Sequence, residues 1–264
     1  MVTFLSDFGT RDSYAAEVRG AILSVDPGLR VIDVTHEIAR HDVRDGAWVL
    51  ARTATAFPPG TVHLAVVDPG VGTSRRAVAV EAGGHVLVGP DNGLLGWAAS
   101  ALGGADGAGW REIDAAGVPA RNPISLTFHG RDLLGPAAAA IASGRVAPGS
   151  LGRRIDDPVV VPFPAARVGT GEVLAEVVRV DGFGNLILAV RASDLPPGAL
   201  AGEVSIVPPG GATAVPAVSG PYGTGGGLVV HEDSSGYVEV AVPGGSAAER
   251  LGARAGTRMA LRWR

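Results

Sequence analysis

The feature that most constrains the fold is an alternation, over the first half of the chain, of short β-branched runs with longer alanine-rich segments. The short runs predict strands at Val2–Leu5, Val31–Val34, Val62–Val67, Ala77–Val80 and Val86–Val88. The alanine-rich segments predict helices at Ser13–Val25, Asp42–Ala56, Gly93–Ala101 and Leu133–Ser143. Strands separated by helices pair in parallel through right-handed crossovers. We therefore expect a layered α/β domain with a mostly parallel sheet.

The second part of the chain has a different pattern. From Val168 onward, short apolar runs alternate with turns rich in glycine and proline. These runs predict strands at Glu172–Val180, Leu186–Val190, Glu203–Val207, Gly227–His231, Tyr237–Val242 and Arg258–Trp263. Short strands with little helix between them predict a small all-β, barrel-like domain. Because Pro162-Phe163-Pro164 interrupts both patterns, we expect domains at 1–164 and 165–264.

Composition narrows the class of protein. Hydrophobic residues make up 46% of the chain and charged residues 18%, as in compact folded domains. Because there is no cysteine, disulfides, thiolate nucleophiles and zinc–thiolate sites are excluded. The net charge of -4 gives no basic surface for nucleic acid. The apolar runs are too short to cross a bilayer and the first residues include no basic signal-peptide segment, so we expect a cytoplasmic protein with no membrane partner.

Two aspartates directly follow predicted strands. Asp7 follows the first strand, and a carboxylate there can accept two hydrogen bonds from a ribose diol. Asp68 follows the strand that ends at Val67, and the Pro/Gly-rich loop after it returns Arg75 toward the same strand end. Open α/β sheets bind ligands at the carboxyl ends of their strands, which favours a functional role. A turn or N-cap role for Asp7 and a purely structural Asp68–Arg75 ion pair are the alternatives.

A histidine stands at the entrance of the last predicted helix of the first domain. His129 lies in Thr127-Phe128-His129-Gly130-Arg131-Asp132, directly before Leu133–Ser143. An imidazole in that position can bind substrate and handle a proton near neutral pH. The alternative is a solvated or helix-capping histidine, which a single loop position does not distinguish.

Two turns of the second domain carry polar and aromatic side chains. Asp181-Gly182-Phe183-Gly184-Asn185 has the residues of a β-hairpin turn, which is its simplest interpretation. Its Asp, Phe and Asn are also suited to bind an amine, stack on a flat base and pair with the edge of that base. Ser234-Ser235-Gly236-Tyr237 is likewise either a turn or a pair of hydroxyls that binds an anion.

One pattern resembles a zinc site but is not one. In His36-Glu37-Ile38-Ala39-Arg40-His41, the two histidines are one residue too far apart for a zinc-protease helix. On a helix they would point about 140° apart, so they could not share a metal ion. We therefore expect no metal site.

In their order along the chain, the motifs resemble the family of S-adenosyl-L-methionine (SAM) hydroxide adenosyltransferases, relatives of the 5′-fluorinase and 5′-chlorinase. The resemblance runs nearly end to end. It rests on Leu5-Ser6-Asp7-Phe8-Gly9, Asp33-Val34-Thr35-His36-Glu37-Ile38, Val67-Asp68-Pro69-Gly70-Val71-Gly72-Thr73, Gly89-Pro90-Asp91-Asn92-Gly93, Thr127-Phe128-His129-Gly130-Arg131-Asp132 and Asp181-Gly182-Phe183-Gly184-Asn185. The resemblance implies an α/β domain followed by a β-barrel, and a homotrimer with SAM bound between subunits.

The resemblance also implies a role for each candidate residue. Asp68, Arg75 and His129 would form a catalytic triad that handles water. The expected substrate-binding residues are Asp7 for the ribose, Asp181 for the methionine amine, Ser234 or Ser235 for the carboxylate, Phe183 and Asn185 for the adenine, and Trp48 as an aromatic pocket residue. The chain departs from its relatives at Pro243-Gly244, where many have Asn-Arg before a glycine.

The implied reaction is attack of water or hydroxide on the ribose C5′ of SAM, giving adenosine and L-methionine without a cofactor. A halide nucleophile, as in a chlorinase, is the nearest alternative. The halogenases resembled here carry Tyr at the position of Asp68, and the fluorinase has Ser at Gly130 and an added loop that this chain lacks. A carboxylate repels a halide, so Asp68 favours water. A SAM- or adenosine-binding protein without turnover is the alternative from another class.

Overall fold

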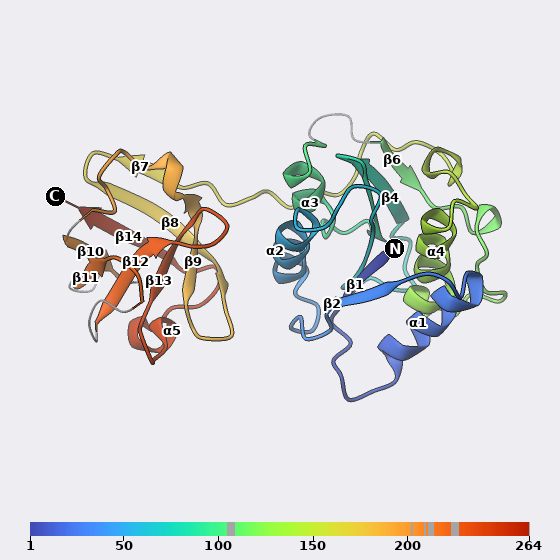
Figure 1. Cartoon of the computed structure of the whole chain (residues 1–264), viewed down its shortest axis with the longest axis horizontal. Coiled ribbons are helices and arrows are strands. Elements are labelled where there is room, and N and C mark those ends of the chain that lie inside the picture. Colours follow the sequence, from blue (N-terminus) through green and yellow to red (C-terminus); the bar gives the residue numbers. More distant parts are fainter. Residues whose placement is uncertain (105–108, 202, 209, 211–213, 223–226, 264) are drawn as a thin grey trace. The chain divides into compact units, whose positions relative to one another are not determined.

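The computed structural model of the chain describes residues 1–104, 109–201, 203–208, 210, 214–222 and 227–263. The chain forms two compact units, Met1–Val161 and Pro162–Arg264, shown at the right and left of Figure 1. None of the helices in the described ranges is long and apolar enough to cross a membrane.

The first unit contains a six-stranded sheet in the order β2-β1-β3-β5-β4-β6. Its strands are β1 (Val2–Ser6), β2 (Val31–Thr35), β3 (Val62–Val66), β4 (Ala77–Ala82), β5 (His85–Pro90) and β6 (Gly109–Glu112). β2, β1, β3 and β5 run parallel, which confirms the predicted mostly parallel sheet. β4 pairs antiparallel with β5, because Gly83 and Gly84, both at positive φ, close a tight hairpin where no helix intervenes. β4 also pairs antiparallel with β6 on its other side.

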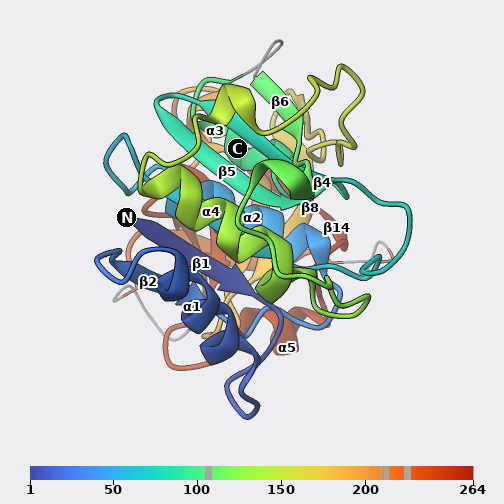
Figure 2. The same ribbon diagram turned by 90° about the vertical axis from the view of Figure 1, so that its right-hand side faces the viewer.

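Helices cover both faces of this sheet. They are α1 (Tyr14–Val25), α2 (Val43–Ala54), α3 (Gly96–Ala101) and α4 (Gly135–Ala142), with a π-helical turn η2 (Gly130–Leu134) before α4 and short 3-10 turns η1 (Ala115–Gly117) and η3 (Pro148–Ser150). α1 and α4, in front in Figure 2, pack on the face that contains Phe4. α2 and α3 pack on the opposite face, against Leu5. Successive residues of β1 thus enter two different cores, which explains why this strand is buried throughout.

The second unit is a closed β-barrel. Its elements are β7 (Arg167–Gly169), β8 (Glu172–Val180), β9 (Leu186–Arg191), η4 (Ala192–Asp194), β10 (Glu203–Val207), β11 (Val215–Ser219), β12 (Leu228–Glu232), β13 (Tyr237–Ala241), α5 (Ala247–Leu251) and β14 (Arg258–Trp263). β14 pairs with both β10 and β8, which closes the ring and confirms the predicted barrel. The sequence did not predict β7, β11 or α5, which are three to five residues long.

Candidate active site

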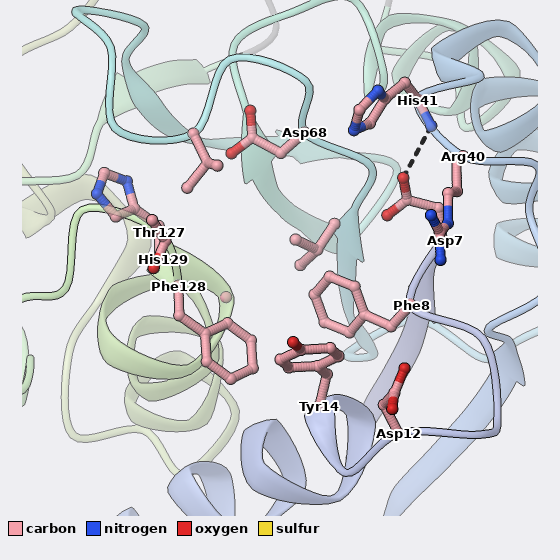
Figure 3. Close-up of a pocket in the computed structure, with 13 residues that line it drawn as sticks. Asp7, Phe8, Asp12, Tyr14, Arg40, His41, Asp68, Thr127, Phe128 and His129 are labelled. Carbon is pink, nitrogen blue, oxygen red and sulfur yellow. Dashed lines mark hydrogen bonds between the residues drawn. The ribbon is translucent and has the colours of Figure 1, made fainter.

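The candidate site lies at the carboxyl ends of two neighbouring parallel strands. Ser6 of β1 pairs with Val66 of β3, so the residues after both strands emerge at one edge of the sheet. Asp7 and Asp68 line a cavity of about 420 Å³ at this edge (Figure 3). The cavity is lined by Asp7, Phe8, Asp12, Tyr14, Arg40, His41, Val66, Asp68, Val71, Thr127, Phe128, His129 and Gly130.

The three residues predicted to handle water form one chain of hydrogen bonds. Nε of Arg75 donates to both carboxylate oxygens of Asp68, 3.0 Å from Oδ1 and 2.9 Å from Oδ2, and Nη2 also donates to Oδ2. The same Nη2 donates to Nδ1 of His129 over 3.0 Å. The Arg75 and Asp68 side chains are only 10% and 6% exposed, so salt screens this ion pair weakly. Asp68 and His129 line the cavity and Arg75 joins them.

The hydrogen bond from Arg75 decides which nitrogen of His129 carries a proton. A guanidinium only donates, so Nδ1 of His129 accepts and Nε2 carries the hydrogen of the neutral ring. Burial, and then the charge of Arg75, lower the pKa of His129 below its ordinary value of 6.5, although Asp68 and Asp132 oppose the shift. At pH 7 His129 is therefore neutral, and its Nε2–H is a hydrogen-bond donor.

A buried carboxylate fixes the segment that presents His129. Asp132, which is 1% exposed, accepts the backbone N–H of Ser125 at 2.9 Å and pairs with Nε of Arg131 at 2.7 Å. Arg131 also pairs with Glu17 of α1 at 2.9 Å. These contacts tie both sides of His129 to the helical layer, which holds the imidazole at the cavity.

Asp7 and Trp48 have different surroundings. Oδ2 of Asp7 accepts the backbone N–H of His41 at 2.9 Å, the dashed line in Figure 3. Trp48 lies on α2, is 2% exposed, and packs near the guanidinium of Arg52. Trp48 is outside the set of described residues that line the cavity.

Sequence reasoning missed an aromatic wall of the cavity. Phe8, Tyr14 and Phe128 gather on one side of it in Figure 3, with ring centroids 5.4–6.1 Å apart in edge-to-face contact. Phe8 follows Asp7 and Phe128 precedes His129, so their adjacency to predicted site residues was an available signal. Tyr14 carried no such signal, because it lies at the start of a helix and is adjacent to none of the predicted site residues.

In the barrel unit, Asp181 stabilises its own turn. Its Oδ1 accepts the backbone N–H groups of Phe183 and Asn185, each at 2.9 Å, which is the turn role expected as the simpler interpretation. Nδ2 of Asn185 donates to Oδ2 of Asp181 over 3.1 Å. The side chain of Phe183 is 82% exposed, so this turn presents an unburied ring.

Ser234 and Ser235 lie in the turn between β12 and β13. Tyr237, just after this turn, pairs with Arg191 at the end of β9, whereas the Asp181 turn adjoins Leu186 at the start of β9. Nη1 of Arg191 donates to the backbone oxygen of Ser235 over 3.2 Å. Within one barrel, the two predicted groups of binding residues are therefore at opposite ends of β9.

The part of the chain that the structure describes contains no group of three or more His, Asp or Glu side chains placed to hold a metal ion. His36 and His41 are not on a helix, since residues 36–41 form turns and bends. His41 lines the cavity, while His36 is buried and hydrogen-bonded to Ser6.

Comparison with known proteins shows which family this chain belongs to. The family model described as the SAM hydroxide adenosyltransferase N-terminal domain matches residues 2–152. The model of the C-terminal domain of the same family matches residues 175–260. The chain belongs to the SAM hydroxide adenosyltransferase family. The N-terminal match contains the complete Asp68–Arg75–His129 chain, and the C-terminal match contains both barrel turns described above.

Individual relatives agree with this membership. An (R)-S-adenosyl-L-methionine hydrolase of Salinispora arenicola is 42% identical over 98% of this chain and 96% of its own. A fluorinase of Actinoplanes sp. is more distant, at 28% identity over 74% of this chain and 73% of its own. A solved structure of an uncharacterized conserved protein from Thermotoga maritima is 32% identical, with a TM-score of 0.91 over 100% of both chains.

Proposed function

We propose that this chain hydrolyses SAM by attack of water or hydroxide on the ribose C5′, giving adenosine and L-methionine. The observation that carries the proposal is the Asp68–Arg75–His129 hydrogen-bond chain beside Asp7 at one cavity. The similar protein from Salinispora arenicola, which covers nearly the whole chain, is named as a hydrolase of this substrate.

The chemistry of the substrate sets what the site must supply. The sulfonium of SAM leaves as a neutral thioether, so the reaction needs no general acid, metal or organic cofactor at the leaving group. It needs a water molecule aimed along the C5′–S bond in a pocket with little competing water. The C5′–O bond forms as the C5′–S bond breaks, the electron pair stays on sulfur, and the water loses one proton.

The hydrogen-bond polarity of the site suits one bound water. Nε2–H of His129 donates to the water oxygen, and the carboxylate of Asp68 accepts a hydrogen bond from the water and then takes its proton. Arg75 pairs with the carboxylate of Asp68 and holds Nδ1 of His129, so that the imidazole stays in the tautomer that donates from Nε2. Arg75 is thus a positioning residue in this proposal.

The remaining predicted residues complete substrate binding in the proposal. Asp7 binds the ribose hydroxyls in the first-unit cavity. Phe183 and Asn185 bind adenine, and Asp181 binds the amine. The amine and carboxylate of methionine share one carbon, and the Ser234–Ser235 turn lies at the other end of β9, so the hydroxyl that binds this carboxylate comes from the Ser234 or Ser235 of a second barrel. The chain acts as a cytoplasmic homotrimer whose sites lie between subunits; the exposed ring of Phe183 is consistent with a surface that meets a neighbour or a ligand.

Product analysis tests the reaction directly. The purified protein is incubated with SAM in ¹⁸O-labelled water, with and without chloride. The nucleosides are then separated by chromatography and their masses are measured by mass spectrometry. We expect adenosine that carries the label on its 5′ hydroxyl, in the same yield with or without chloride.

Two results would overturn the proposal. Formation of 5′-chloro-5′-deoxyadenosine in place of adenosine would make the protein a halogenase. Tight SAM binding with no nucleoside product would make it a binding protein without turnover.

A further inference from the structure

The turn that carries Asp7 is held from the outside by one neighbouring segment, residues 36–41. The backbone oxygen of His36 accepts the N–H of Gly9 at 2.7 Å, and the N–H of His41 donates to Oδ2 of Asp7 at 2.9 Å. Gly9 has φ +70° and His41 has φ 63°, a region that non-glycine residues rarely occupy. Two backbone positions are therefore set in unusual conformations, one on each side of the contact that holds the Asp7 carboxylate.

The side chain of His36 makes the third contact with the same turn. Its Nδ1 lies 2.8 Å from Oγ of Ser6, and this hydroxyl also accepts the backbone N–H of Phe8 at 3.3 Å. Ser6 is fully buried and the His36 side chain is 6% exposed. The residues on both sides of Asp7 are thus fixed through one imidazole, while Asp7 and Phe8 themselves line the cavity.

The other side of the imidazole faces an acid. Nε2 of His36 lies 3.2 Å from Oδ1 of Asp33, but it makes a hydrogen bond with none of the described residues. Oδ2 of Asp33 pairs with Nη1 of Arg19 on α1 at 2.5 Å. With its hydrogen on Nε2, His36 accepts the O–H of Ser6 at Nδ1, which leaves the Ser6 oxygen free to accept the N–H of Phe8.

This arrangement resembles a Ser-His-Asp triad, but it does not serve as one. Ser6 has no exposed surface, and its hydroxyl is already committed to His36 and to the backbone of Phe8. A nucleophile needs access to substrate. The chain Ser6–His36–Asp33 therefore acts on the shape of the turn and not on bonds of a substrate.

We propose that His36 is a positioning residue that fixes the Asp7 turn, so that the Asp7 carboxylate meets the substrate in a preset geometry. The inference rests on the proposed function only in taking the ribose of SAM as the partner of Asp7. A fixed carboxylate binds a diol without a further ordering cost, so the contribution of His36 should appear in binding.

The test compares His36→Leu, which removes both ring nitrogens, with His36→Asn, which can keep a polar partner for Ser6. We expect His36→Leu to raise KM for SAM and Kd for adenosine about tenfold with kcat changed less than about twofold. His36→Asn should restore most of the affinity. Thr3→Val is the matched control: Thr3 Oγ1 makes an equally buried hydroxyl–imidazole contact from β1, to His63, at the other end of the strand.

A double-mutant cycle separates positioning from general destabilisation. If His36 acts through the Asp7 turn, His36→Leu should raise Kd for adenosine much less in an Asp7→Ala background than in the wild type. Equal effects in both backgrounds, or a tenfold loss of affinity in Thr3→Val as well, would overturn the inference. A wild-type protein that binds adenosine but releases none from SAM would refute only the proposed function; one that binds neither SAM nor adenosine would refute both.

Discussion

The two ends of the parallel strands of the first unit use the same kinds of side chain in opposite ways. At the amino ends, Thr3, His63 and His85 form a closed group: Thr3 Oγ1 lies 2.7 Å from His63 Nδ1, and His63 Nε2 lies 3.0 Å from His85 Nδ1. All three side chains are buried. At the carboxyl ends, Asp68 and His129 also belong to a hydrogen-bonded chain, but they line a cavity.

The difference lies in what surrounds each histidine and not in residue type: His63 is enclosed by the protein, whereas His129 lines the cavity. Burial, and then the charge of the neighbouring His85, lower the pKa of His63 to about 4, so His63 is neutral and its two nitrogens contact Thr3 and His85. His129 is also neutral at pH 7, but only Nδ1 is held by Arg75, and the residue faces a space that a ligand can enter.

The largest predicted effect is a loss of turnover on mutation at the carboxyl ends of the parallel strands. Asp68→Ala and His129→Ala should each lower kcat about a hundred- to ten-thousand-fold, because each removes one of the two groups that we propose hold the attacking water. SAM binding, measured by calorimetry, should persist. Thr3→Val at the amino end should leave kcat near the wild-type value. Wild-type turnover in either Ala variant would mean that the water is held elsewhere.

The next largest effect is a loss of folding stability at low pH, caused by His63 at the amino ends of the parallel strands. Between pH 6.5 and pH 4 the unfolded chain protonates His63 while the folded chain does not, so acid favours unfolding in this window. We expect the free energy of unfolding to fall by about 3 kcal/mol across it. Denaturant titrations at several pH values measure this.

A His63→Gln variant is the control for that loss. It should be less stable at pH 7.5 but should lose less further stability on acidification. If its stability falls across pH 6.5–4 as steeply as that of the wild type, another group is responsible.

The smallest predicted effect is a shift in the pH dependence of kcat/KM, which tests the role of Arg75. In the proposed mechanism His129 acts in its neutral form, so kcat/KM should fall on acidification only below pH 6.5 in the wild type. Arg75→Met removes a charge that lowers the pKa of His129, so the acidic limb of the pH profile should move to higher pH. Arg76→Met is the matched control, since Arg76 pairs with Asp91 and Asp157 instead. An unmoved limb in Arg75→Met would contradict the assignment.

Much of the fold was predictable because it depends on local patterns. The strands β8, β10 and β14 have the predicted bounds, since apolar alternation between Gly/Pro turns marks their ends. β6 was missed because its four residues, Gly109–Glu112, carry no alternation. The β4–β5 hairpin was not foreseen, because its pairing depends on the positive φ of two glycines and not on a periodic pattern.

For the site, the sequence identified which residues follow the strands but not how they connect. Asp7 and Asp68 were predictable because parallel strands deliver their following residues to one edge. The role of Trp48 stays a prediction: it lies on α2, is buried, and is outside the cavity lining of the described residues. His36 was considered only as a metal ligand, and its contact with Ser6 bridges 30 residues.

The sequence by itself determined the two-part architecture, the residues at the strand ends and the family. Only the tertiary structure decided that Arg75 joins Asp68 to His129, 54 residues away, and that Nδ1 of the imidazole is the acceptor. It also decided that one end of the sheet is closed by its own histidines while the other leaves a cavity. The physical reason is that hydrogen-bond polarity and burial depend on which atoms meet in space, and a linear pattern does not specify those partners.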